Sequence, residues 1–101
     1  MEKRFKDDAT RSLWEGRPTK AARRAVPSPY HASARIRLDF VVQAASLAAF
    51  RALPPGADFK ELHGRLRGTY QLRIAGPYRI RFRWSIDHTY AIEARQFHDE
   101  D

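Results

Sequence analysis

Residues 70–84 read YQLRIAGPYRIRFRW, and their alternation decides the fold of this 101-residue chain. Apolar and polar side chains take turns on both sides of a central turn, Ala75-Gly76-Pro77. Such period-two alternation predicts an antiparallel hairpin with one buried face. The buried face is expected to hold Tyr70, Leu72, Ile74, Tyr78, Ile80, Phe82 and Trp84, and the open face Gln71, Arg73, Arg79, Arg81 and Arg83. Because guanidinium groups are planar forks suited to phosphate, a row of them predicts an anion-binding surface.

The overall charge also indicates a negatively charged partner. The chain has 19 Lys and Arg against 12 Asp and Glu, a net charge of +7 and a pI of about 10.4. Between Phe59 and Arg95, eight basic residues are opposed by three acids. Nucleic acid, an acidic protein or an anionic membrane surface would complement such a field.

Other features of the sequence exclude several classes of protein. The chain has no cysteine, which excludes disulfides, thiolate metal sites and a thiol nucleophile. The first residues, MEKRFKDD, lack the apolar stretch of a signal peptide, and the longest apolar run, residues 40–50, is too short to span a bilayer. We therefore expect a cytoplasmic protein, and the length indicates a single domain over residues 1–101.

Two helices are expected before the hairpin. The first begins at Asp7 or Asp8 and ends before Gly16. The basic segment 19–29 is expected to be a loop that allows one helical turn. The second helix is expected from about residue 30 to residue 53, with an apolar stripe wide enough to pack on a sheet. The centre of that stripe comprises Ile36, Phe40, Ala44 and Leu47.

Strands dominate the second half of the chain. We expect a short extended segment at 59–62, hairpin strands at 69–74 and 78–84, and a last strand at 90–97, with a candidate edge strand at residues 1–5. On the last strand the predicted buried residues are Tyr90, Ile92 and Ala94, and the predicted open-face residues are Ala91, Glu93, Arg95 and Phe97. The fold class is therefore α+β, with two N-terminal helices packed on a three- or four-stranded antiparallel sheet whose arginine face is open.

Four short motifs follow one another in this half of the chain. They are Leu62-His63-Gly64, Gly68-x-Tyr70-x-x-Arg73, Tyr78-Arg79-Ile80-x-Phe82 and the strand end Phe97-His98. Their order resembles the HigB branch of the RelE/ParE toxin superfamily, the toxin halves of bacterial toxin–antitoxin pairs. The resemblance implies a RelE-like domain that cuts mRNA in the ribosomal decoding site, contacts ribosomal RNA there and inhibits translation. It also implies a helix-turn-helix, HigA-like antitoxin as partner, a bacterial cytoplasmic location, and no cofactor, metal or membrane.

The resemblance implies roles for individual residues. Arg79 and Arg73 match basic strand positions of the family and His98 matches its C-terminal histidine, so these three are the expected catalytic residues. Relatives usually end in Asp-Tyr-His, whereas this chain has Gln96-Phe97-His98, which lacks two titratable groups. The expected RNA-binding residues are Lys60, His63, Arg65, Arg67, Arg81 and Phe97.

The implied chemistry needs no nucleophile from the protein. The ribose 2′-hydroxyl attacks the adjacent phosphate, so the protein must align the strand, stabilise charge on phosphorus and move protons. Arginines suit the charge and an imidazole suits the proton transfer. Phe97 either stacks on a base or makes an apolar closing contact.

Two other functions stay open at this level. One is a non-nuclease toxin of the same fold, such as a ParE-like inhibitor of DNA gyrase. The other is an inactive module that binds RNA or the antitoxin. Alternating arginines are also common on strand faces that do no more than meet solvent.

Overall fold

The alternation in residues 70–84 produces the hairpin that it predicts. The structure, a computed structural model, describes residues 3–98 and contains a four-stranded antiparallel sheet in the order β1-β2-β3-β4. The strands are β1 (Lys60–Glu61), β2 (Thr69–Ala75), β3 (Tyr78–Ser85) and β4 (His88–Gln96). Tyr70 pairs with Phe82 and Leu72 with Ile80, and these apolar pairs face the core. The predicted α+β class is confirmed.

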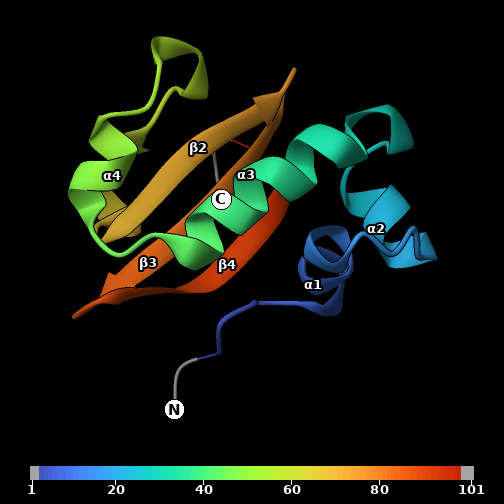
Figure 1. Cartoon of the computed structure of the whole chain (residues 1–101), viewed down its shortest axis with the longest axis horizontal. Helices are drawn as coiled ribbons and strands as arrows, with labels where there is room; N and C mark the ends of the chain where they lie inside the picture. The colour runs from blue at the N-terminus through green and yellow to red at the C-terminus, as the bar shows by residue number, and fades with distance from the viewer. Residues whose placement is uncertain (1–2, 99–101) are drawn as a thin grey trace.

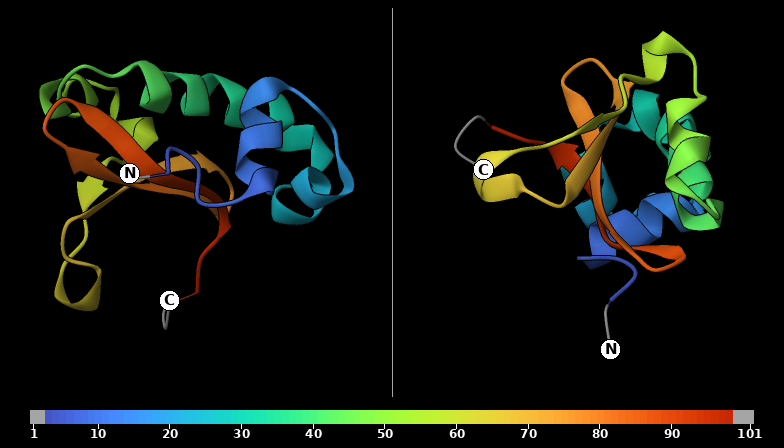
Figure 2. Two further views of the ribbon diagram at one scale, coloured as in Figure 1. Left: turned by 90° about the horizontal axis from the view of Figure 1, so that it is seen from below. Right: turned by 90° about the vertical axis from the view of Figure 1, so that its left-hand side faces the viewer.

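The helices lie mainly on one side of this sheet. They are α1 (Asp8–Glu15), α2 (Lys20–Ala25), α3 (His31–Gln43) and α4 (Leu47–Arg51), with short 3-10 turns at Ser28–Tyr30, Pro55–Ala57 and Gly64–Leu66. α3 and α4 cover one face of the sheet, while α1 and α2 lie together at one end of α3 (Figure 1). The loop with the Gly64–Leu66 turn and the segment after β4 project from the opposite face (Figure 2).

The first helix follows the sequence prediction closely. Asp7 is the N-cap, and its side chain accepts a hydrogen bond from the Thr10 backbone N–H at 2.8 Å. Gly16 ends the helix in the left-handed conformation with φ 75°, which glycine adopts without steric cost. Beside it, the segment 19–29 is more helical than predicted, because Thr19 caps the six-residue helix α2 through a bond from the Ala22 N–H.

The prediction of one continuous helix to residue 53 was wrong. α3 ends at Gln43, the backbone turns extended at Ala44, and α4 follows as a separate helix. Long-range contacts satisfy carbonyl groups of the last turn of α3: the Thr89 hydroxyl donates to Val41 O at 2.8 Å, and Arg4 Nη2 donates to Val42 O at 2.8 Å. Local periodicity carries no information about such partners.

The earlier end of the helix also changes its buried face. Ala34, Leu38 and Val41 are fully buried, whereas Ile36, placed at the centre of the predicted stripe, is 71% exposed. Leu38 and Val41 belong to the predicted stripe as residues that widen it, so the prediction is correct for these two and wrong for Ile36. The expected packing of α3 on the sheet is confirmed, since it contacts β2 and β4.

An aromatic cluster joins α3 and α4 to the sheet. Phe50 of α4 is fully buried, and its ring centroid lies 5.3 Å from that of Phe40, 5.3 Å from Phe59 and 4.8 Å from Phe82. Aromatic pairs at these separations add stability beyond the area that they bury. The cluster fixes the sheet under the helices and leaves its other face clear of them.

A bulge in β4 overturns the predicted position of one residue. The β3–β4 register shifts between Arg81 and Arg83, and Ala91 adopts φ 50° there. Ile92 and Ala94 are buried as predicted, but Tyr90 pairs with Arg83, and its hydroxyl contacts the Arg83 side chain on the arginine face. Strict alternation assigned Tyr90 to the core because a bulge cannot be read from period-two spacing.

The N-terminal segment lies along the edge of β4. Phe5 forms a parallel bridge with Ile92, and the Lys6 N–H donates to Ile92 O at 2.8 Å. This supports the predicted edge strand for residues 3–5; Met1 and Glu2 lie outside the described residues. None of the helices within residues 3–98 has the length and apolar character needed to cross a membrane.

Candidate nucleic-acid interface

The sheet face opposite α3, called the cationic face below, carries three rows of side chains set by strand pairing. The rows are Arg73–Arg79–Arg95, Lys60–Gln71–Arg81–Glu93 and Thr69–Arg83–Tyr90. Successive rows lie two residues apart along the strands, which corresponds to about 7 Å. Cationic side chains therefore occur in every row over most of the width of the sheet.

The row formed by Arg73, Arg79 and Arg95 places like charges directly opposite one another. Arg73 pairs with Arg79 across β2–β3, and Arg79 pairs with Arg95 across β3–β4. Like charges in opposed positions destabilise a sheet unless an anion lies between them. Among residues 3–98, neither Arg73 nor Arg79 forms an ion pair with a carboxylate. Arg73 and Arg79 therefore lie on one face of the sheet, as the alternation in the sequence predicts.

The hairpin turn orients Arg79. Its Nη1 donates to Gly76 O at 2.6 Å and to Tyr78 O at 3.1 Å, so the guanidinium lies against the β2–β3 turn. Arg73 is exposed on the neighbouring strand. An anion at this end of the sheet meets one guanidinium fixed by backbone carbonyls and one that can adjust.

A groove of about 300 Å³ lies along the same face. Its floor is formed by β3 and β4, and Arg65 and Leu66 from the projecting loop line it together with Phe97 from the segment after β4. Further lining residues are Lys6, Thr69, Arg81, Phe82, Arg83, Ala91, Glu93 and Arg95. Over the whole lining, Arg65 included, five residues are Lys or Arg and one is Glu. The groove has the charge and the open shape expected for a nucleic-acid strand.

Phe97 contributes to the groove in a way that the sequence did not predict. The guanidinium carbons of Arg81 and Arg95 each lie 4.1 Å from the centroid of its half-buried ring. Gln71 Oε1 accepts from Arg81 Nε at 2.9 Å and steadies the first of these cations. The closing contact of Phe97 is therefore with two cations, which are held in place by cation–π attraction.

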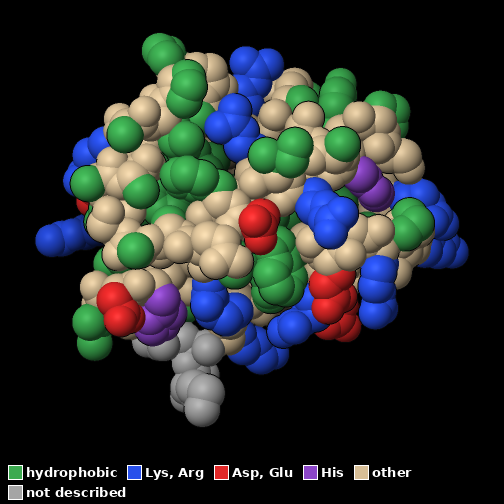
Figure 3. Space-filling model, viewed as in Figure 1, with side chains coloured by type: hydrophobic (Ala, Val, Ile, Leu, Met, Phe, Trp, Pro, Cys, Tyr) green, Lys and Arg blue, Asp and Glu red, His purple; other side chains and the backbone are tan. Residues whose placement is uncertain are grey.

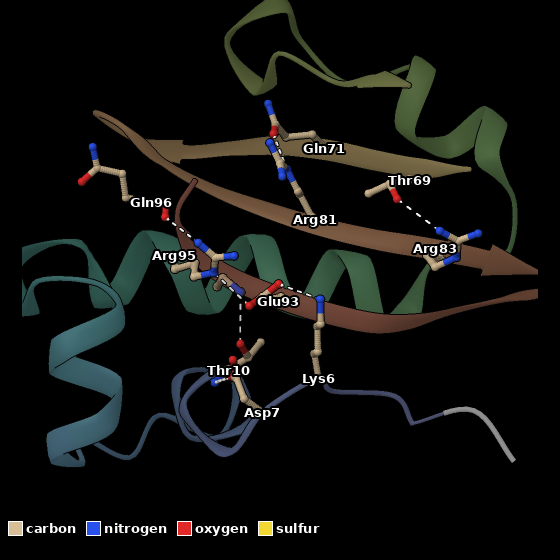
Figure 4. Close-up of polar contacts among 11 residues, drawn as sticks. Lys6, Asp7, Thr10, Thr69, Gln71, Arg81, Arg83, Glu93, Arg95 and Gln96 are labelled. Carbon is tan, nitrogen blue, oxygen red and sulfur yellow. Dashed lines mark hydrogen bonds and ion pairs between the residues drawn. The ribbon is translucent and has the colours of Figure 1, made fainter. Parts of the chain in front are cut away.

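Lys6 and Glu93 are components of the groove that sequence reasoning did not include among the site residues. Glu93 Oε2 accepts from Arg95 Nε at 2.9 Å, Lys6 Nζ lies 3.5 Å from Glu93 Oε1, and the Glu93 side chain is only 13% exposed. Figure 4 shows these contacts beside the Gln71–Arg81 and Thr69–Arg83 pairs on one side of the sheet. Alternation did signal the face of Glu93, but the parallel bridge of Phe5 that brings in Lys6 has no local signal.

The other predicted site residues are exposed on β1, on the projecting loop and after β4. Lys60 is exposed on β1 in the row of Arg81, and His63, Arg65 and Arg67 are exposed on the projecting loop. His98 is exposed after β4, where Gln96 pairs with Tyr78, so the chain end begins beside the strand that carries Arg79.

The helix-covered side of the molecule has a different character. Acidic and basic side chains are interspersed there, and hydrophobic side chains gather beside α4 (Figure 3). A hollow of about 620 Å³ on this side is lined by Trp14, Glu15, Arg35, Ile36 and Asp39, and the Trp14 indole N–H donates to Asp39 Oδ1 at 3.1 Å. Its charges are of both signs, so the cationic face remains the candidate site for an anionic ligand.

The fold and this face define a small α+β protein with a cationic sheet surface, of the RelE-like type. Residues 3–97 match the family described as RelE-like toxin of type II toxin-antitoxin system HigB. The chain belongs to this family of toxins, and the family implies an antitoxin partner. No curated protein matches the chain at a significant level.

Proposed function

We propose that this toxin is a ribosome-dependent mRNA endonuclease that inhibits translation, with the cationic face as its RNA-binding surface. The observation that carries the proposal is the opposed Arg73–Arg79 pair beside the strand end that leads to His98. A phosphodiester relieves the repulsion between those guanidiniums, and the repulsion in turn favours binding of an anion whose charge increases during the reaction.

In the proposed reaction the ribose 2′-oxygen forms a bond to the adjacent phosphorus while the bond from phosphorus to the 5′-oxygen breaks. The proton of the 2′-hydroxyl passes to a base, and the departing 5′-oxygen receives a proton from an acid, which leaves a cyclic phosphate and a 5′-hydroxyl. Arg73 and Arg79 stabilise the extra charge on the phosphate oxygens, and His98 serves as general acid or base. The ribosome supplies the strand geometry that a shallow open face does not impose alone.

Further basic residues of the cationic face and of the projecting loop bind the strand beyond the reacting phosphate. Lys60, His63, Arg65 and Arg67 follow the backbone along β1 and the projecting loop, and Arg81 acts from the floor. Phe97 either offers its remaining ring surface to a base or keeps Arg81 and Arg95 aimed into the groove. A helix-turn-helix, HigA-like antitoxin is the partner that we propose for neutralisation.

Mapping of mRNA 5′ ends after induced expression tests this proposal in cells. Wild-type protein should produce new ends at codon-linked positions, whereas Arg79→Ala and His98→Ala should produce few or none. Arg51→Ala, which removes an exposed arginine from α4 on the other side of the sheet, is the matched control and should behave as wild type.

A gyrase inhibitor of the same fold is the second candidate. It is favoured by Gln96 and Phe97, which leave His98 as the one titratable side chain of the Gln96-Phe97-His98 ending. Toxicity that survives both Arg79→Ala and His98→Ala, together with inhibition of DNA supercoiling by purified toxin, would replace the nuclease proposal with this one.

A further inference from the structure

The far end of β3 carries a second guanidinium that, like Arg79, is oriented by two hydrogen bonds. Arg83 is exposed on the cationic face, yet its Nε donates to the Tyr90 hydroxyl at 3.3 Å and its Nη1 to the Thr69 hydroxyl at 3.3 Å. Both partners are neutral, and among residues 3–98 Arg83 has no carboxylate partner. Its charge therefore remains uncompensated while two hydrogen bonds orient it.

Two unusual backbone positions build this arrangement. Gly68 has φ 86°, and a Cβ atom added there would lie 2.9 Å from Arg83 Nη2, so glycine leaves the space that the guanidinium occupies. Ala91 has φ 50° within the β4 bulge, and this bulge turns Tyr90 from the core onto the cationic face. Left-handed backbone at a non-glycine residue within a strand is unfavourable and tends to persist where a side chain has to be re-aimed.

The N-terminal segment supports the bulge from outside. The Ala91 N–H donates to Lys3 O and the Ile92 N–H donates to Arg4 O, each at 2.8 Å. The strained backbone is thus fixed by a segment far away in the sequence, and Tyr90 is held in register with Arg83.

Arg83 and Arg79 serve different positions of a bound strand. They lie four residues apart on β3, about 13 Å, and their contacts draw them in opposite directions. Arg79 bonds to the β2–β3 turn at Gly76, and Arg83 bonds to the residue that opens β2. The two guanidiniums do not converge on one phosphate.

We propose that Arg83, positioned by Thr69, Tyr90 and Gly68, is a second phosphodiester-binding position for the RNA strand that Arg79 holds. This inference rests on the proposed function, and it assigns Arg83 to binding and not to the chemical step. Arg81 lies between the two positions on β3, and both Arg81 and Arg83 line the groove, so the strand follows β3. Thr69 and Tyr90 are positioning residues that act through Arg83.

Additivity of salt dependence tests the proposal. The probe is a fluorescent, 2′-O-methylated RNA oligonucleotide of about eight nucleotides, which cannot be cut, and the readout is anisotropy across a salt series. Each lost phosphate contact on a single strand lowers the slope of log K against log salt by about 0.7. Arg79→Gln and Arg83→Gln should each lower the slope by that amount, and the double variant by about twice as much. Arg51→Gln, with the same change of charge on α4, should leave the slope unaltered.

Variants of the residues that position Arg83 separate the effect of the orientation of its guanidinium from the effect of its charge. Thr69→Val and Tyr90→Phe keep the net charge, so they should lower affinity about two- to tenfold, the effect of one neutral hydrogen bond, with cleavage sites on ribosomes unchanged. Gly68→Ala should displace the guanidinium and resemble Arg83→Gln, and circular dichroism checks that it folds.

The possible failures point to different errors. If the wild-type protein cuts mRNA on ribosomes but Arg83→Gln binds the oligonucleotide as tightly as wild type, this inference alone is overturned. A double variant that binds no more weakly than Arg79→Gln has the same meaning. Additive losses in a protein that never cuts mRNA support the second position and overturn the nuclease proposal. If the wild-type protein does not bind the oligonucleotide, the proposal that Arg83 is a second phosphodiester-binding position is overturned.

Discussion

At the scale of single residues, the cationic face combines repulsion with fixed geometry. Arg73, Arg79 and Arg95 stand in one row. Arg79 is held by backbone carbonyls and Arg81 by the Gln71 amide, and these neutral partners leave the positive charge in place. The exception is Arg95, whose Nε is bound by Glu93. The Glu93 carboxylate lowers the net positive charge of the face while it orients Arg95 and Lys6. A substitution of Glu93 therefore tests the effect of net charge against the effect of side-chain orientation.

Glu93→Gln is expected to change RNA binding and cleavage in opposite directions. The loss of a negative charge should tighten non-specific binding of single-stranded RNA at low salt. Cleavage on ribosomes should fall, because Arg95 and Lys6 lose the carboxylate that positions them. Glu61→Gln, the same change at an exposed position of β1 that pairs with Tyr70, is the control for charge alone. Equal cleavage rates for the two variants would contradict this role of Glu93.

Phe97→Leu is expected to weaken RNA binding, although leucine is also apolar. The ring attracts two guanidiniums, each by about 0.5–1 kcal/mol at a partly exposed site, and leucine has no such attraction. Phe97→Tyr keeps the ring and should bind RNA within about twofold of wild type. Anisotropy with a short RNA measures both, and a leucine variant that binds like the tyrosine variant would show that the ring is dispensable.

At the scale of elements, helix α1 connects the N-terminal region to the site strand. Its Thr10 hydroxyl accepts a bond from the buried Ala94 N–H at 3.0 Å, next to Glu93 and Arg95. Asp7 caps the same helix at the Thr10 N–H. The stability of this helix therefore bears on the edge of the sheet that carries the groove.

Asp7→Ala is expected to destabilise the protein by about 1 kcal/mol, the usual effect of losing an N-cap. Asp8→Ala removes the same charge from the first turn but no capping bond, so it should lose about 0.5 kcal/mol or less through the helix dipole. Urea denaturation followed by circular dichroism compares the two midpoints. Equal midpoints would mean that the cap contributes nothing beyond its charge.

The elements also show which features a sequence can reveal. The hairpin, its turn and the shared face of Arg73 and Arg79 follow from strict alternation, which is a local property. The end of α3 does not, because the groups that satisfy its carbonyls lie 48 and 38 residues away.

The same limit applies to the site. Lys6 reaches the groove through a parallel bridge between the N-terminal segment and β4, and Tyr90 through a bulge stabilised by the backbone of that segment. Neither contact leaves a periodic signal in the chain. The positions of Arg73, Arg79, Arg81 and Phe97 on the cationic face were predictable from alternation. The face of Glu93, which orients Arg95, was predictable too, whereas that of Tyr90, which orients Arg83, was not.

At the scale of the whole molecule, the core gives the cationic face its rigid support. Phe50 sits at the centre of the aromatic cluster and is fully buried. Phe50→Ala should cost about 3–5 kcal/mol, a large part of the roughly 5–15 kcal/mol that stabilises a typical domain. Ile36→Ala, at a position 71% exposed, should change stability by about 0.5 kcal/mol or less. Thermal unfolding of the two variants provides the comparison, and similar losses would contradict the observed core.

The direct test of the central claim is single-turnover cleavage of mRNA on purified ribosomes with a defined codon in the decoding site. Wild-type toxin should cut at one position and leave a 5′-hydroxyl, and Arg51→Ala should match it. Arg79→Ala and His98→Ala should slow the cut by a hundredfold or more, roughly the contribution of one charge-stabilising or proton-transferring group. Cleavage at the wild-type rate by either variant, or no cleavage by the wild-type protein, would contradict the account.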